Sequence, residues 1–253
     1  MPFLFGVASA VDLAELPGPA LVRMLGDLGL SDPAARALIA RMRRDGQLTG
    51  TRHGRSVHYR LAGAFAESFQ RVRTGATGSP WRGHFHTVLY QVPERHRAFR
   101  DALRRTAQFA GYGLLQQGVL ICPEDRRDRL AGVLADAPDE AQVHFARLEL
   151  PTPDAARAAR TAWRLDELDA LYRTHAATLR AALTDVPAPD GASLRRFADL
   201  LSEPLVDTLR ATGLPPELAP PDWSLPELRR AIGQLHGLYL APVTAYVRQL
   251  VAP

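Results

Sequence analysis

The sequence contains no lysine, so all 31 of its basic side chains are arginines. Guanidinium groups are planar and donate paired hydrogen bonds, a geometry that suits phosphate groups and guanine edges. The formal net charge is only +4, and this total is weak evidence for a nucleic-acid partner. The position of the charge along the chain is therefore more informative than its sum.

Cysteine is almost absent as well. The one cysteine, Cys122, excludes an internal disulfide framework and a cysteine-rich zinc site, and it agrees with a reducing cytoplasm. Because Cys122 lies in the apolar run GVLIC, we expect it to be a small buried hydrophobic side chain rather than a reactive thiolate.

Long apolar runs are also missing. No run reaches the roughly 18–20 residues that a membrane span requires. The apolar start MPFLFGVASA lacks the basic residues of a signal peptide, since the first basic residue is Arg23. We therefore expect a cytoplasmic protein with no membrane partner. With 253 residues, 46% hydrophobic and 23% charged, the chain is typical of a globular protein of two or three domains.

The first 61 residues predict two short helices followed by a hairpin. Apolar residues at helical spacing indicate a helix over 20–28, which Gly29 ends. Ser31 can cap a second helix over 32–44. The stretch QLTGTRHGRSVHYRLA then predicts two short strands around a turn near His53 and Gly54. This order is typical of a winged helix.

Arginine is concentrated in this part of the chain. Between positions 36 and 73 the sequence has nine arginines and two histidines, and its only acidic residues there are Asp45 and Glu67. Such an excess neutralises DNA phosphates, because counterion release supplies most non-specific affinity. We predict that the helix over 32–44 enters the major groove and that the hairpin touches the backbone or minor groove. The alternative is that these arginines only solvate a helix face. The predicted DNA-binding residues are Ser31, Arg36, Ala37, Ala40, Arg41, Arg43, Arg44, Arg52, His53, Arg55, Ser56 and His58.

The rest of the chain alternates strands with helices and then becomes helical. A helix over 64–73 and the linker TGATGSP come first, then predicted strands in HFHTVLYQV, GVLIC and VHFARLEL and a helix over 94–109, as in a small α/β sandwich. Further helices are predicted over 155–163, 165–183, 194–209 and 225–251. The expected fold class is α+β, with a winged helix-turn-helix domain over 1–74, a ferredoxin-like domain over 79–150 and a helical domain over 151–253.

Four ordered segments resemble one protein family. SDPAARALIARMRRDGQL with RHGRSVHYRLA is similar to the winged helix of the PaaX family, the repressors of phenylacetate catabolism. WRGHFHTVLYQVPERHRAFRDALRR with GYGLLQQGVLICP resembles its middle domain, a ferredoxin-like module akin to small CRISPR-associated nucleases. AARAARTAWRLDELDALYRTH and GLPPELAPPDW resemble its C-terminal part. The resemblance implies a homodimeric repressor that binds an inverted-repeat DNA operator and is released by an aryl-CoA effector such as phenylacetyl-CoA.

The sequence departs from the family pattern at several positions. Ala37 and Ala40 stand where the recognition helix often has Thr and Ser, so we expect a different operator. Gln47 replaces a tryptophan, and the first helix is abbreviated to about 3–16. Gln91 stands where the related nucleases have a metal-binding aspartate. We therefore expect neither nuclease activity nor any other enzyme activity.

Few candidate ligand sites lie outside the predicted winged-helix domain. The resemblance implies an effector site among the middle and C-terminal segments. The residues predicted for it are Trp163, Arg164, Tyr172 and Arg173, because an arginine beside an aromatic surface suits an aryl thioester with its phosphates. The alternative is that the two rings only anchor helices on the sheet. His84 and His86 share one strand face, as in some zinc sites, but a third ligand is not evident. We expect no metal, cofactor or catalytic residue. A regulator that responds to a protein partner or acts constitutively, and a metal-dependent hydrolase, remain as alternative functions.

Overall fold

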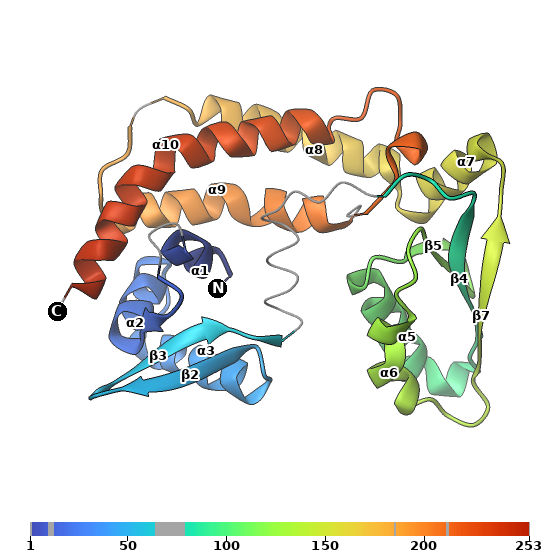
Figure 1. The fold of residues 1–253 in the computed structure, drawn as a ribbon, viewed down its shortest axis with the longest axis horizontal. Coiled ribbons are helices and arrows are strands. Elements are labelled where there is room, and N and C mark those ends of the chain that lie inside the picture. Colours follow the sequence, from blue (N-terminus) through green and yellow to red (C-terminus); the bar gives the residue numbers. More distant parts are fainter. Residues whose placement is uncertain (1, 10–12, 64–78, 185, 211–212, 253) are drawn as a thin grey trace. The chain divides into compact units, whose positions relative to one another are not determined.

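A computed structural model describes residues 2–9, 13–63, 79–184, 186–210 and 213–252 (Figure 1). The chain packs into two compact units. The first contains residues 1–75, 175–205 and 227–253, and the second contains residues 76–174 and 206–226. The helix expected over 64–73 and the first five residues of the expected linker lie outside the described residues. Within the described residues, no helix is long and apolar enough to span a membrane.

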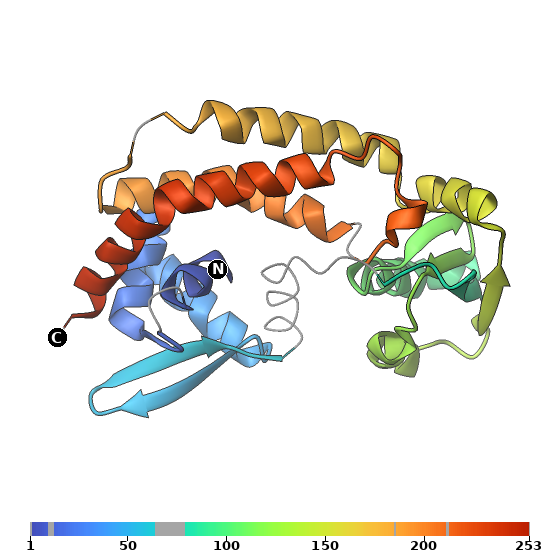
Figure 2. The same ribbon diagram turned by 45° about the horizontal axis from the view of Figure 1, so that its top comes forward.

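The first unit begins with three helices and a small antiparallel sheet. The helices are α1 (Pro2–Ser9), α2 (Gly18–Asp27) and α3 (Asp32–Arg44), and the strands are β1 (Leu16–Pro17), β2 (Leu48–His53) and β3 (Ser56–Leu61), in the sheet order β1-β3-β2. Positions 54 and 55 form the turn of the β2–β3 hairpin, and Gly54 has a φ of +59°, which favours glycine. Figure 2 shows this hairpin extending away from the helices of the same unit.

One sequence expectation in this region was wrong. The first helix was predicted over about 3–16, but it ends at Ser9, and Leu16 belongs to β1. Both the local sequence and tertiary packing prevent the helix from reaching Leu16. Pro17 disfavours helical backbone at Leu16, and Leu16 is fully buried where it pairs with Tyr59 of β3.

Helices from the end of the chain complete the first unit. Helix α9 (Gly191–Arg210) and helix α10 (Leu225–Val251) lie mostly in this unit, and α8 (Leu165–Ala181) enters it at residue 175. The ring of Phe197 in α9 stacks on Tyr239 of α10 at 5.0 Å between centroids and meets the edge of Phe3 in α1, also at 5.0 Å. Segments nearly two hundred residues apart therefore share one hydrophobic core.

The second unit contains a four-stranded antiparallel sheet in the order β5-β6-β4-β7. Its strands are β4 (His84–Gln91), β5 (Gly113–Gln116), β6 (Val119–Cys122) and β7 (Gln142–Glu149), and its helices are η1 (Glu94–His96), α5 (Arg97–Phe109), η2 (Arg127–Leu130), α6 (Ala131–Ala135), α7 (Thr152–Ala162) and η3 (Pro216–Leu218). Leu103 and Ala107 of α5 pack on Val88 and Leu120 of the sheet, and all four are fully buried.

Candidate nucleic-acid interface

Helix α3 has one buried face and two exposed ones. Ser31 caps the helix by accepting a hydrogen bond from the Ala34 amide at 3.4 Å. The buried face consists of Ala35, Ile39 and Met42. Because successive residues are about 100° apart around a helix, positions 36, 40 and 43 form one exposed stripe, and positions 37, 41 and 44 form the next.

The stripe with Arg36, Ala40 and Arg43 borders a groove next to the hairpin. The groove has a volume of about 550 Å³ and is lined by Gly18, Pro19, Arg36, Ile39, Ala40, Arg43, Arg55, Ser56, Val57 and Tyr59. Three guanidinium-bearing residues therefore meet there, two from α3 and one from the hairpin turn. Five of the predicted DNA-binding residues are brought together by this groove, which we call the α3–β3 groove.

Two contacts set the electrostatics of the α3–β3 groove. The guanidinium carbon of Arg43 lies 5.9 Å from the ring centroid of Tyr59, close enough for a cation–π contact. A guanidinium nitrogen of Arg36 lies 3.8 Å from the Asp32 carboxylate, but both side chains are about 70% exposed. An ion pair this exposed contributes little, so the groove keeps most of its positive charge.

The second stripe points away from the buried face. Ala37, Arg41 and Arg44 are all exposed. They lie about 100° around α3 from the groove stripe. The predicted contacts of this helix thus occupy two adjacent faces, of which one borders the hairpin.

Two of the predicted residues in the hairpin, His53 and His58, lie on its opposite face. Side chains alternate along a strand, so Tyr59 faces the α3–β3 groove while His58 faces away from it. On that far face, Nε2 of His53 lies 3.3 Å from a carboxylate oxygen of Glu15, and the Thr51 hydroxyl donates to the other oxygen at 3.4 Å. The rings of His53 and His58 are 4.6 Å apart. His53 and His58 therefore do not line the groove.

Arg52 forms a hydrogen bond within the turn of the hairpin. Its Nε donates a hydrogen bond to the carbonyl oxygen of Gly54 at 3.2 Å. This bond braces the tip of the hairpin, and the rest of the exposed side chain stays available to solvent.

The four predicted effector residues are not gathered in one cavity. Trp163 is 8% exposed and contacts Phe85, with ring centroids 6.2 Å apart. Tyr172 is fully buried, and its hydroxyl donates to the Asp207 carbonyl at 3.1 Å. The two arginines are exposed and paired, Arg164 with Glu167 at 2.5 Å and Arg173 with Asp169 at 3.1 Å. Burial of both rings fits the anchoring alternative better than an open aromatic surface.

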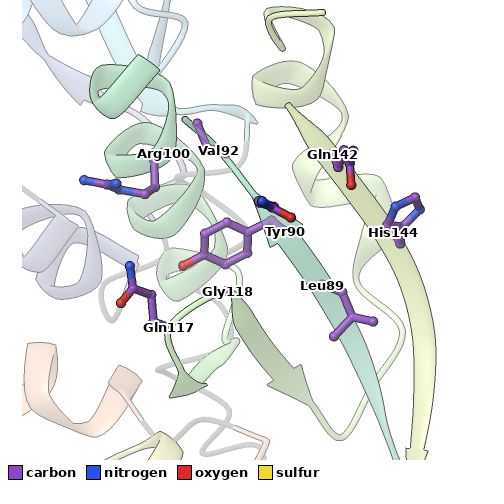
Figure 3. A pocket seen from close by; sticks show the side chains of 9 residues that line it. Leu89, Tyr90, Val92, Arg100, Gln117, Gly118, Gln142 and His144 are labelled. Carbon is purple, nitrogen blue, oxygen red and sulfur yellow. The ribbon is translucent and has the colours of Figure 1, made fainter. Parts of the chain in front are cut away.

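A shallow hollow surrounds Gln91, the position of interest for nuclease chemistry. It measures about 420 Å³ and is lined by Leu89, Tyr90, Gln91, Val92, Arg100, Gln117, Gly118, Gln142 and His144. Figure 3 shows Arg100 of α5 on one side of β4 and the Gln142 and His144 side chains of β7 on the other. These lining residues supply amides, an imidazole and a guanidinium, but no carboxylate. Divalent metals in nucleases are held by carboxylates, so this hollow lacks the ligands for that chemistry.

His84 and His86 do share a strand face, as predicted. Their ring centroids are 5.1 Å apart, and Nδ1 of His86 lies 3.9 Å from an Asp125 carboxylate oxygen. Burial lowers the pKa of His86 despite the nearby carboxylate of Asp125, which raises it. Arg127 donates to the same carboxylate and holds the pKa of Asp125 at about 2. Asp125 is therefore already engaged by an arginine.

Comparison with known proteins adds a family and a fold. A family model described as "PaaX-like protein" matches residues 4–65, and another described as "PaaX protein central Cas2-like domain" matches residues 78–165. The two matches together cover more than half of the chain. The solved structure of uncharacterized protein Rv0674 from Mycobacterium tuberculosis is similar, with a TM-score of 0.62 and 21% identity over 99% of this chain and 97% of that chain. At this identity the likeness shows the fold alone. Curated proteins gave no match.

Proposed function

The chain belongs to the PaaX family of transcription regulators, and from this premise we propose that residues 2–61 bind double-stranded DNA as a winged helix. In this proposal α3 is the recognition helix and lies in the major groove, and the β2–β3 hairpin is the wing. The observation that carries it is the meeting of Arg36, Arg43 and Arg55 at the α3–β3 groove. A phosphate backbone that enters this groove would meet three guanidinium groups from two elements.

The second exposed stripe of α3 supports the same orientation. Arg41 and Arg44 are exposed next to the groove stripe. A helix seated in a major groove presents one side to base edges and its neighbouring side to phosphates. We assign Arg36 and Arg43 to phosphates beside the wing and the stripe of Ala37, Arg41 and Arg44 to the base edges. With alanine at position 37, base reading by this stripe depends on Arg41 and Arg44, and arginine favours guanine.

We propose a homodimeric repressor that reads an inverted repeat, because a two-fold protein matches a two-fold site. An aryl-CoA effector would release it by binding the non-operator conformation more tightly. The burial of Trp163 and Tyr172 gives this effector site less support than the DNA site, so control by a protein partner remains the second candidate. The carboxylate-free hollow at Gln91 argues against a hydrolase.

Fluorescence anisotropy with a labelled fragment of the upstream intergenic region tests the DNA site. We expect Arg36→Ala and Arg43→Ala each to weaken binding roughly 3- to 10-fold near 0.1 M salt and to reduce the slope of log K against log salt by roughly 0.9 for each phosphate that the variant no longer neutralises. Arg105→Ala, which removes an exposed arginine of α5 in the other unit, is the matched control.

Circular dichroism of each variant verifies that the fold is intact. Wild-type affinity and an unchanged salt slope in both groove variants would refute the assignment of α3. Equal losses of affinity in the groove variants and in Arg105→Ala would show that only the total charge matters.

A further inference from the structure

We propose that Glu15, His53 and His58 form a binding site for one divalent transition-metal ion of the zinc class on the far face of the wing. The ligand atoms of these three residues all lie within 4.8 Å of one another. The site is separate from the α3–β3 groove, which lies on the other face of the hairpin. It is also separate from the His84 and His86 pair, which lies in the other unit.

The sheet brings the three ligands together from distant positions. His58 lies within the central strand β3, His53 ends β2, and Glu15 directly precedes β1, so each strand of the β1-β3-β2 sheet places one ligand. The register pairs Pro17 and Thr51 with His58 on its two sides. Because Thr51 and His53 are two apart in a strand, they share a face with His58.

The distances suit a small ion. Zinc binds imidazole nitrogen and carboxylate oxygen at about 2.0–2.2 Å in tetrahedral geometry, which puts neighbouring ligand atoms roughly 3.3–3.5 Å apart. Nε2 of His53 and the carboxylate oxygen of Glu15 are already 3.3 Å apart. The Thr51 hydroxyl bonds the second oxygen of this carboxylate and orients it, as outer groups do around bound metals.

The donor set and its exposure define the class of ion. Two imidazoles and one carboxylate suit Zn²⁺, Co²⁺ and Ni²⁺ better than Mg²⁺ or Ca²⁺, which prefer oxygen ligands. The side chains of His53 and Glu15 are 54% and 23% exposed, so an ion can reach the site from solvent. Three protein ligands leave one tetrahedral position for water or an anionic oxygen.

Occupation of the site would act on DNA binding, an inference that rests on the proposed function. The ion replaces the negative field of Glu15 on the wing with a net positive one and ties β2 and β3 to the segment before β1. One added favourable phosphate interaction should raise DNA affinity roughly 3- to 10-fold near 0.1 M salt. The site would then make operator binding responsive to zinc-class ions.

Calorimetric titration of the tag-free full chain with Zn²⁺ tests the site without DNA, and the visible absorption of Co²⁺ reports tetrahedral coordination. We expect one ion per chain and at least about 10-fold weaker binding in Glu15→Gln, His53→Gln and His58→Gln, because even changes to the groups that only orient metal ligands cost that much. The double variant His84→Gln with His86→Gln removes two imidazoles elsewhere and should bind as the wild type does.

The same variants are then measured in anisotropy with Zn²⁺ or with EDTA. Only proteins with all three ligands should gain DNA affinity with Zn²⁺. Absence of saturable Zn²⁺ uptake, or uptake that the His84 and His86 variant abolishes and the site variants retain, would overturn the metal site. Zn²⁺ uptake without an effect on DNA would overturn the coupling alone, and failure to bind DNA under any condition would refute the proposed function while the titration still decides the site.

Discussion

At the scale of single residues, Cys122 shows how burial decides reactivity. The side chain is 1% exposed at the end of β6, in agreement with the expectation of a small hydrophobic residue. Loss of water raises the pKa of the Cys122 thiol to about 11, although the guanidinium of Arg126 acts in the opposite direction. The thiolate is therefore a very small fraction of the population at neutral pH.

We predict that Cys122 reacts with iodoacetamide at pH 8 at least about 100-fold more slowly in the folded protein than in the unfolded chain, because the thiolate is the nucleophile and its fraction falls tenfold for each unit of pKa. Mass spectrometry of timed samples, with and without 6 M guanidinium chloride, measures both rates. Similar rates in the two conditions would contradict the burial of this thiol.

At the scale of elements, the junction of α7 and α8 depends on one strained residue. Arg164 follows Trp163, the C-cap of α7, and has a φ of +52°. Left-handed backbone costs a non-glycine residue about 1–2 kcal/mol, while its exposed ion pair with Glu167 returns at most about 1 kcal/mol. This left-handed residue joins the end of α7 to the start of α8.

This junction yields a prediction about stability. Arg164→Gly and Arg164→Ala both remove the ion pair, but only glycine relieves the backbone. The glycine variant should be more stable than the alanine variant by about 1 kcal/mol, as measured by urea denaturation followed by circular dichroism. An alanine variant that is equally stable would mean that the left-handed turn does not exist in solution.

Most helices and strands of the structure could be predicted from the sequence, but some of the short ones could not. Helical periodicity predicted α2, α3 and the long helices, because each has a clear apolar stripe, and strand alternation around the Gly54 turn predicted the hairpin. It missed β5 (Gly113–Gln116) and α6 (Ala131–Ala135), which are short and depend on tertiary contacts. In β5, Gly113 is required because a Cβ atom there would lie 2.8 Å from Trp163, a contact that no local pattern reveals.

The candidate site was predictable to a similar degree. Strand alternation was enough to separate His58 from Tyr59 once the hairpin was assigned. The partner of the two histidines was not predictable, because Glu15 has no spacing relationship with positions 53 and 58 and meets them only through β1. The three-domain division remains a prediction, since the end of the chain packs into both compact units.

At the scale of the whole molecule, the first unit depends on a contact between its beginning and its end. The Tyr246 hydroxyl of α10 donates to the Asp27 carboxylate of α2 at 2.6 Å. The Asp27 side chain is 12% exposed and also lies 3.6 Å from Arg23. Burial, followed by the hydrogen bond to Asp27, raises the pKa of Tyr246, so the phenol stays protonated and remains a donor.

We expect Tyr246→Phe to lower the free energy of unfolding by about 1–3 kcal/mol, because a largely buried carboxylate loses its hydrogen-bond donor. Tyr90→Phe is the matched control, since the Tyr90 hydroxyl is buried and without a hydrogen-bond partner among the described atoms, and its removal should be close to neutral. Thermal and urea unfolding measure both variants. Equal losses of stability would show that the Asp27 contact is not special.

The contact between Asp27 and Tyr246 also has a consequence for biosynthesis. Tyr246 lies 219 residues after Asp27 in the chain. A ribosome that adds roughly 5–20 residues per second therefore synthesises Tyr246 roughly 10–45 seconds after Asp27. Until then, α2 lacks its contact with α10, and α1 lacks its ring contact with α9 until Phe197 has been added. Nascent chains must therefore keep an unfinished apolar surface at the tunnel exit for most of their synthesis, which makes this segment a natural client for chaperones that act during translation.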